Sequence, residues 1–206
     1  MGRKETEVQQ ASQIIYPCMQ CADIFELKAD ITQLGMDQRK VNVLARELGP
    51  KLGFWKPVVV SHRMLMGLGE PPKGEGEDRI LELKMSISRP DTAIFMNDSE
   101  EDIKRKIGKA YCPSKVIEEN PLMDYSKYLV FEKFSAMEIK RPEQFGGDLL
   151  VENYKELEKL YSERKIHPMD LKNSVAHCIN EMIRPVRDAL NNDKKLRHLL
   201  DTIKKF

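Results

Sequence analysis

The sequence has no hydrophobic run of the length that a membrane span requires. Residues 1–7 are largely charged and polar and lack the apolar centre of a signal peptide. The formal net charge is only +1, so bulk electrostatics favour no nucleic-acid partner, and any basic surface must be local. These absences predict a protein that does not associate with membranes and lies in the cytoplasm.

Candidate metal ligands are also scarce. Of four cysteines, only Cys18 and Cys21 have the spacing of a redox pair or half a zinc site. A zinc site would need a second ligand pair at that spacing, and the sequence offers none. We expect no metal site and two small buried thiols, with a redox pair as the alternative. No Gly-Lys-Ser/Thr follows the glycine-rich stretch 69–78, which excludes a phosphate-binding P-loop.

The composition is that of an ordinary globular protein, since 41% of the 206 residues are hydrophobic and 33% are charged. Residues 29–32 and the β-branched run 57–61 are typical of strands. The periodic stretch between them predicts a helix that Asp37 caps and Gly49 ends. Strand, helix and strand form a βαβ unit. A preceding helix is expected to begin at Pro17, because proline suits a first helical turn.

Helical patterns dominate from residue 99 onward. Ser99 and Asp102 resemble a capping box, and Pro121 and Pro168 each suit the start of a helix. Another helix is expected over residues 151–163. The sequence therefore predicts an α/β fold in two parts, 1–92 and an all-helical 93–206.

One helical face in the first part is unusually polar. Tyr16, Gln20 and Asp23 are spaced four and three residues apart, which places them on one side of a helix. A phenol, an amide and a carboxylate suit a small ligand with an amine at one end and a hydroxyl at the other. The alternative is a set of satisfied polar contacts inside a core.

Three stretches occur in a characteristic order: Tyr16-Pro-x-x-Gln20-x-x-Asp23, Gly-Met-Asp-Gln-Arg-Lys at 35–40, and Lys-Met-Ser-Ile-Ser at 84–88. Together they resemble the second half of a class I aminoacyl-tRNA synthetase catalytic domain, whose KMSKS signature is similar to 84–88. With residues 110–113, 140–147 and 167–173, nearly the whole chain resembles the tyrosyl-tRNA synthetases of archaeal and eukaryotic type. The resemblance implies half of a Rossmann-like catalytic domain over 1–92 and a helical anticodon-binding domain over 93–206.

The resemblance also implies a role for each matching residue. The amine and carboxylate of tyrosine would meet Tyr16, Gln20 and Gln38, and the substrate phenol would donate to Asp23. Asp37 would lie near the adenylate ribose. Lys84 would be the catalytic lysine on the triphosphate, with Met85 also at ATP and Ser86 and Ser88 as further catalytic hydroxyl donors. In the helical part, Phe145 would stack on an anticodon base and Asp170 would bind its edge, with Cys112 and His167 as neighbours.

A basic run in the helical part is a candidate for phosphate contacts, although acidic neighbours favour a merely solvated face. It comprises Lys104, Arg105, Lys106, Lys109 and Lys115.

The chain departs from the family pattern in two respects. Ile87 stands where the signature usually has a polar or small residue. The family's HIGH-type motif has no counterpart, since His62 and His167 stand in other contexts, so the first half of the catalytic domain is missing. We therefore expect the chain alone to be inactive.

The resemblance implies a tyrosine-tRNA ligase or its C-terminal portion, with tyrosine, tRNA(Tyr) and ATP with Mg²⁺ as substrates. The complete protein would form a homodimer through its N-terminal half. The alternatives are a non-catalytic tRNA-binding fragment and a half-enzyme that needs a separate N-terminal chain.

Overall fold

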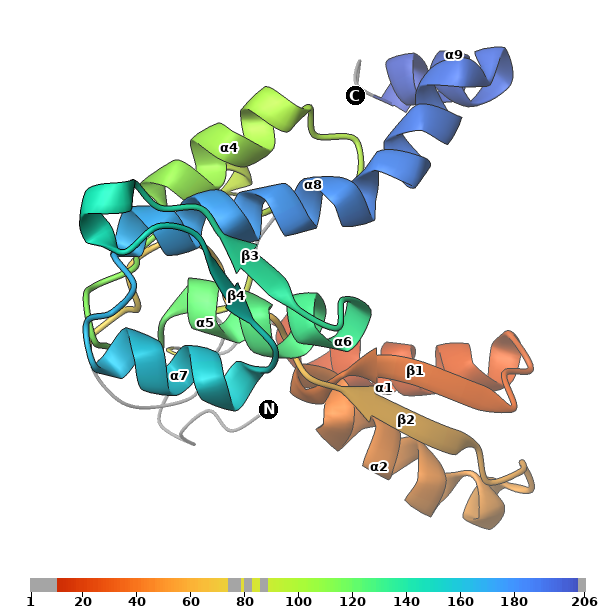
Figure 1. Cartoon of the computed structure of the whole chain (residues 1–206). Coiled ribbons are helices and arrows are strands. Elements are labelled where there is room, and N and C mark those ends of the chain that lie inside the picture. Colours follow the sequence, from red (N-terminus) through yellow and green to blue (C-terminus); the bar gives the residue numbers. More distant parts are fainter. Residues whose placement is uncertain (1–10, 74–78, 80–82, 86–88, 204–206) are drawn as a thin grey trace. The chain divides into compact units, whose positions relative to one another are not determined.

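A computed structural model describes residues 11–73, 79, 83–85 and 89–203 of the chain (Figure 1). The chain packs as two compact units, Met1–Met64 with Lys73–Leu81, and Leu65–Pro72 with Glu82–Phe206. Leu68 is buried in the core of the second unit, so by packing this unit begins before residue 93. The boundary between residues 92 and 93, as a division between a catalytic part and an anticodon-binding part, stays a prediction.

The first unit contains the expected βαβ motif. Strand β1 (Ile31–Gly35) and strand β2 (Val58–His62) are parallel, with Ile31 opposite Val58, and helix α2 (Arg39–Leu48) connects them. Helix α1 (Ala11–Glu26) packs against α2 through a core of Cys21, Ile24, Val41 and Ala45. The 3₁₀ turns are η1 (Met36–Gln38) and η2 (Pro50–Leu52).

Two local expectations for this unit are wrong. Helix α1 begins at Ala11, so Pro17 lies inside the helix instead of opening it. Proline lacks an N–H and gives up one helical hydrogen bond there, and the residues of α1 that reach the core, Cys21 and Ile24, lie beyond it. Asp37 lies within η1, and the residue that precedes α2 is Gln38, whose side chain makes no capping bond.

One face of the two-stranded sheet is left uncovered by the described residues and carries three apolar side chains. On this face Ile31 is 65% exposed, Val58 54% and Val60 47%. The sequence predicted a fully apolar, β-branched strand over 57–61, and β2 occupies Val58–His62. The exposure is unusual because parallel sheets are normally covered on both faces.

The second unit is mainly helical, and α4 and α8 pack side by side in it (Figure 1). Its helices are α4 (Glu100–Lys109), α5 (Pro121–Tyr125), the π-helix η4 (Ser126–Val130), α6 (Phe131–Lys133), α7 (Tyr154–Ser162), α8 (Pro168–Asn192) and α9 (Lys194–Ile203), with the 3₁₀ turn η3 (Pro90–Thr92) before them. The expected helix starts at Pro121 and Pro168 are confirmed. Ser99 Oγ accepts a bond from the Asp102 N–H at 3.0 Å, as the capping pattern predicts.

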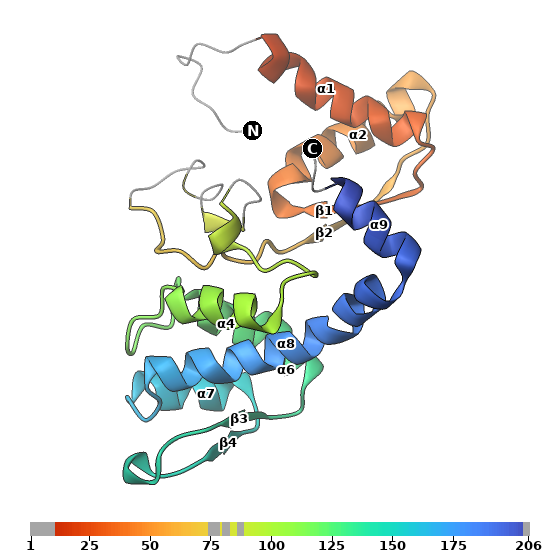
Figure 2. The ribbon, with the colours of Figure 1, turned by 90° about the horizontal axis from the view of Figure 1, so that it is seen from above.

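This unit is not all-helical as predicted. Strands β3 (Met137–Ile139) and β4 (Leu149–Val151) form an antiparallel hairpin, with the 3₁₀ turn η5 (Glu143–Phe145) in the loop between them (Figure 2). Val151 belongs to β4, and α7 begins only at Tyr154 after an Asn153 cap. Three-residue strands are too short for alternation to reveal them in the sequence.

Within the described ranges, no helix combines the length and the apolar character needed to cross a bilayer.

Candidate functional site

The polar face of α1 is formed as its spacing predicts. Tyr16, Gln20 and Asp23 lie along one side of the helix, while Cys21 and Ile24 on the neighbouring side reach the core. Tyr16 is 54% exposed and Asp23 is also exposed. Gln20, on the same face, is half-buried. The first unit by itself therefore presents the phenol and the carboxylate on an open surface rather than in a dry pocket.

Gln38 and Asp37 lie at the carboxyl end of β1, the edge of an α/β sheet where ligands usually bind. The Gln38 side chain donates from Nε2 to Asp37 Oδ2 at 3.2 Å. A Cβ on Gly35 would lie 2.5 Å from Asp37 Oδ1 and 2.2 Å from Met64 Sδ. A side chain at position 35 would therefore displace the Asp37 carboxylate and the Met64 thioether from the end of the strand.

Three side-chain amides in this unit carry buried polar atoms that have no hydrogen-bond partner among the described residues. They are Oε1 of Gln20, Oε1 of Gln38 and both amide atoms of Asn42. Asn42 is fully buried on α2, one turn beyond Gln38. It is not among the residues predicted from the sequence, and only its spacing of four residues from Gln38 could have placed it on the same helical face. Because buried amides without partners are costly, the two glutamine oxygens suit a ligand that brings donors.

Lys84 and Met85 belong to the second unit. Both are half-buried, and Lys84 forms an antiparallel bridge with Met66. The remaining signature residues, Ser86, Ile87 and Ser88, lie outside the described residues. The beginning of the predicted catalytic loop is therefore paired with Met66, a residue of the same unit.

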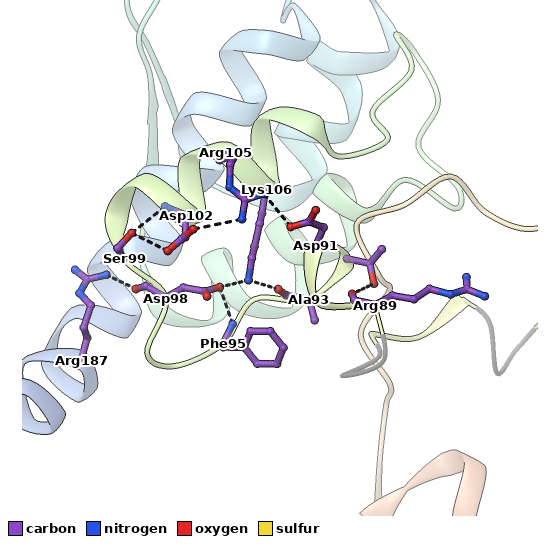
Figure 3. Close-up of polar contacts among 11 residues, drawn as sticks. Arg89, Asp91, Ala93, Phe95, Asp98, Ser99, Asp102, Arg105, Lys106 and Arg187 are labelled. Atoms are coloured by element: carbon purple, nitrogen blue, oxygen red, sulfur yellow. Dashed lines mark hydrogen bonds and ion pairs between the residues drawn. The ribbon is translucent and has the colours of Figure 1, made fainter. Parts of the chain in front are cut away.

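Three of the five residues in the basic run of the second unit, Lys104, Arg105 and Lys106, have acidic partners, and Figure 3 shows the contacts of Arg105 and Lys106. Lys106 is only 4% exposed, and its Nζ lies 2.6 Å from Asp98 Oδ2 and 2.9 Å from the Ala93 carbonyl. Arg105 pairs with Asp91 at 2.8 Å. This pairing holds the pKa of the Asp91 carboxyl below its usual value, first through the hydrogen bond from Arg105. Lys106 therefore holds the loop before α4 and is not available to RNA phosphates.

Phe145 is 65% exposed on a well-formed turn. Its N–H donates to the Pro142 carbonyl at 2.9 Å, and Gly146 and Gly147 follow with φ of 98° and 68°. These left-handed values favour glycine. Arg141 Nε donates to the Gly147 carbonyl at 2.9 Å and fixes the base of the turn. A structured turn that displays an aromatic ring suits stacking on a base.

His167 and Asp170 lie at the start of α8, at the same end of the unit as the Phe145 turn (Figures 1 and 2). The Met169 N–H donates to His167 Nδ1 at 3.2 Å, so this histidine caps the helix. Arg141 Nη1 reaches the Lys165 carbonyl at 2.7 Å and connects the two segments. Arg141 thus links the turn that displays Phe145 to the segment that leads into α8, where His167 and Asp170 lie.

Cys112, the fourth residue predicted to lie near the anticodon, contacts side chains inside the second unit. Its Sγ lies 3.2 Å from Tyr161 Oη and 3.7 Å from Asn120 Nδ2. Burial, followed by the contact with Cys112, raises the pKa of Tyr161, so its hydroxyl stays protonated and donates to the Pro113 carbonyl at 3.0 Å. A role for Cys112 at an RNA surface stays a prediction.

In the part of the chain that the structure describes, no group of histidine, cysteine or acidic side chains could hold a metal ion. Cys18 and Cys21 are both free thiols, and Cys21 is buried as expected, but the expectation of a buried thiol is wrong for Cys18, which is exposed. Burial raises the pKa of the Cys21 thiol, and the neighbouring Cys18 raises it further. A raised pKa favours a structural thiol over a redox pair.

Comparisons with known proteins identify the family. Residues 2–184 match the family described as tRNA synthetases class I (W and Y). The chain is 44% identical over 207 residues to tyrosine--tRNA ligase 1, cytoplasmic, of Arabidopsis thaliana, covering 100% of this chain and 51% of that protein. Tyrosine--tRNA ligase of Aeropyrum pernix is 41% identical, with 98% of this chain and 58% of that protein covered.

Solved structures give the same result. The tyrosyl-tRNA synthetase of Pyrococcus horikoshii, crystallised with L-tyrosine, has a TM-score of 0.82 at 38% identity and covers 97% of this chain and 58% of that one. Tryptophanyl-tRNA synthetase of Aeropyrum pernix, at 17% identity and a TM-score of 0.63 over 92% of this chain and 50% of that one, shares the fold. The chain spans about half the length of the curated relatives named above.

Proposed function

The chain belongs to the class I tRNA synthetases of the W and Y family, which its residues 2–184 match, and from this premise we propose that it is the C-terminal portion of a tyrosine-tRNA ligase. In the complete enzyme it would take part in two steps. Tyrosine and ATP form tyrosyl-adenylate and pyrophosphate, and the tyrosyl group then passes to tRNA(Tyr). Relatives named tyrosine--tRNA ligase at 44% and 41% identity support this choice over a tryptophan enzyme.

The observation that carries the proposal is the α1 face together with the two unpaired glutamine oxygens. Oε1 of Gln20 and Oε1 of Gln38 are buried acceptors without donors in the described part of the first unit. The ammonium group of an amino acid supplies N–H donors for such atoms. Tyr16 would border that end of the substrate. Asp23, three residues beyond Gln20 on the same face, would accept from the substrate phenol and so reject phenylalanine.

ATP is proposed to lie at the carboxyl end of β1, with Asp37 near its ribose, and to enter with Mg²⁺ on its phosphates. Lys84 would meet the triphosphate as charge builds on the departing pyrophosphate, with Met85 beside it and Ser86 and Ser88 adding hydroxyl donors. A cation that arrives late stabilises the transition state more than bound ATP.

The second unit is proposed to bind the anticodon loop, as in the predicted division into a Rossmann-like half over 1–92 and an anticodon-binding part over 93–206. Phe145 would stack on a base, and Asp170 would bind its edge beside His167 and Cys112. The proposal further places the complete enzyme in the cytoplasm as a homodimer, formed through the portion that corresponds to the relatives' N-terminal half. An exposed Phe145 also supports the alternative of a tRNA-binding fragment.

Amino-acid-dependent pyrophosphate exchange tests the proposed function. The assay uses the chain completed with the N-terminal half of a close tyrosine-tRNA ligase, as a fusion or as a second polypeptide. Exchange with tyrosine and not with phenylalanine or tryptophan is the expected result. Exchange with tryptophan would overturn the choice of substrate. Tight tRNA binding without exchange, despite association of the two halves, would favour the fragment or another activity.

Asp23→Ala is expected to damage the use of tyrosine in the completed enzyme. Loss of a hydrogen bond to a charged acceptor costs about 1.5–3 kcal/mol, which corresponds to roughly 10- to 150-fold in kcat/KM for tyrosine. The KM for ATP should stay within about twofold, since Asp23 meets only the phenol.

The matched control is Asp30→Ala, which removes another exposed carboxylate of the first unit and should leave both substrates unaffected. Equal losses for tyrosine and ATP in Asp23→Ala would contradict the assignment.

Phe145→Ala is expected to weaken tRNA(Tyr) binding by the 206-residue chain. Loss of one base-stacking contact costs about 1–3 kcal/mol, or roughly 5- to 150-fold in Kd, at a fixed salt concentration. Leu150→Ala is the control, because Leu150 is 59% exposed on the same hairpin and no base contact is proposed for it. Filter binding or fluorescence anisotropy measures the Kd of both variants for tRNA(Tyr). Similar affinities of the two variants would remove Phe145 from the RNA surface.

A further inference from the structure

The segment before the glycine-rich stretch holds the backbone of Lys84. Lys84 is bridged to Met66, the Gly67 N–H donates to the Leu83 carbonyl at 2.7 Å, and the Met85 N–H donates to the Leu65 carbonyl at 3.3 Å. The approach is close, since a Cβ on Gly67 would lie 3.2 Å from the Lys84 carbonyl oxygen. The position of Lys84 thus follows the position of Met66.

Met66 and Lys84 form the non-hydrogen-bonded pair of this antiparallel bridge, because the hydrogen bonds lie at the residues on either side. The N–H and carbonyl of Met66 therefore point away from Lys84. In the structure both are taken by α5: Asp124 Oδ2 accepts from the Met66 N–H at 3.2 Å, and Tyr125 Oη donates to the Met66 carbonyl at 3.1 Å.

The two side chains that hold Met66 are well suited to fix it. Asp124 is 7% exposed and Tyr125 1%, and every residue of α5 is buried in the core of the second unit. Burial, followed by the charge of Asp124, raises the pKa of Tyr125, which keeps its hydroxyl as a donor. Groups locked by packing hold their partners more precisely than groups on open loops.

The residues that follow the Lys-Met-Ser-Ile-Ser stretch also form hydrogen bonds within the second unit. The Leu68 N–H donates to the Thr92 carbonyl at 2.9 Å, and Lys106 Nζ donates to the Ala93 carbonyl at 2.9 Å (Figure 3). Residues on both sides of the Lys-Met-Ser-Ile-Ser stretch are therefore anchored to the helical unit.

We propose that Asp124 and Tyr125 are positioning residues for Lys84: they hold Met66 by both of its backbone polar groups, and so the core of the helical unit fixes the start of the catalytic loop. This inference rests on the proposed function for the role of Lys84, and on the contacts alone for the anchoring itself.

Hydrogen exchange on the whole chain tests the anchoring without any activity assay. Tyr125→Phe removes only the hydroxyl. Its matched control is Tyr161→Phe, since Tyr161 is also fully buried in the second unit and also donates to a backbone carbonyl, that of Pro113 at 3.0 Å. We expect amide exchange at residues 65–68 and 83–85 to rise about 5- to 10-fold in Tyr125→Phe and to stay unchanged in Tyr161→Phe. No increase at these amides in Tyr125→Phe, or the same increase in both variants, would overturn the proposal.

Asp124 gives a second comparison in the same measurement. Asp124→Leu removes the acceptor for the Met66 N–H and keeps the branching of the side chain at Cγ, whereas Asp124→Asn keeps an acceptor oxygen. Faster exchange at Met66 in Asp124→Leu, with rescue in Asp124→Asn, is expected. Equal exchange in the two variants would contradict an anchoring role for Asp124.

Pyrophosphate exchange by the completed enzyme tests the link to Lys84. Tyr125→Phe should lower kcat by about 5- to 10-fold with an unchanged KM for tyrosine, and this effect should vanish in a Lys84→Ala background. A Tyr125→Phe effect of equal size in both backgrounds would show that positioning of Lys84 is not its cause. If the wild-type completed enzyme supports no pyrophosphate exchange, the proposed function fails. The hydrogen-exchange result still decides whether Asp124 and Tyr125 anchor Met66.

Discussion

The 206-residue chain alone is expected to give no tyrosine-dependent pyrophosphate exchange, and exchange is expected to appear when a second polypeptide supplies the N-terminal half of a close relative. The chain spans about half the length of those relatives. Orientation of reactants can supply about 7–11 kcal/mol of an enzymatic barrier, so a site that lacks part of its framework loses most of its rate.

The open sheet face gives this expectation a structural basis. Ile31, Val58 and Val60 present apolar side chains on a parallel sheet that has only two strands in the described residues. Sheets of this kind are found with both faces covered and more strands at their edges. Tyr16 and Asp23 are exposed as well, so the dry pocket expected for the substrate phenol needs further protein around it.

Complementation can be tested with one disruptive variant and one control. Val60→Asp should prevent association with the added half and abolish exchange, because it places a charge on the open apolar face. Leu150→Asp, at a site of similar exposure in the second unit, should leave exchange intact. Robust exchange by the unaided chain would refute the expectation, and normal complementation by Val60→Asp would show that the added half binds elsewhere.

Lys84→Ala is expected to slow pyrophosphate exchange by about 10²–10³-fold in kcat in the completed enzyme, with the KM for tyrosine within about twofold of the wild type. An ammonium that meets pyrophosphate as its charge develops contributes in the transition state and little to substrate binding. Steady-state exchange at varied tyrosine and ATP concentrations gives both constants.

The control for this variant is Lys109→Ala, which removes an exposed lysine on α4 of the same unit and should leave exchange unchanged. An unchanged exchange rate in Lys84→Ala would remove this lysine from the mechanism. A rise in the KM for tyrosine with normal kcat would assign it to substrate binding instead.

The sequence by itself determined the features that depend on neighbours along the chain. Helical spacing placed Tyr16, Gln20 and Asp23 on one face, and the β-branched run before residue 62 predicted the second parallel strand. The order of three short motifs indicated the family, because each motif combines several specific residues at fixed spacing.

The Ser99 cap and the helix starts at Pro121 and Pro168 were predicted for the same reason. Capping bonds and proline geometry act within a single turn. Local chemistry decides such features before the rest of the chain has packed.

Tertiary structure decided the features whose partners lie far apart in the sequence. Lys106 looked like part of an exposed basic run, and only packing showed that Asp98 and the Ala93 carbonyl hold it inside the protein. Met66 meets Asp124 and Tyr125 across 58 and 59 residues. No periodicity encodes such pairs, because they form only when separate elements share one core. The hairpin of β3 and β4 escaped prediction because its strands are short and are stabilised by pairing with each other.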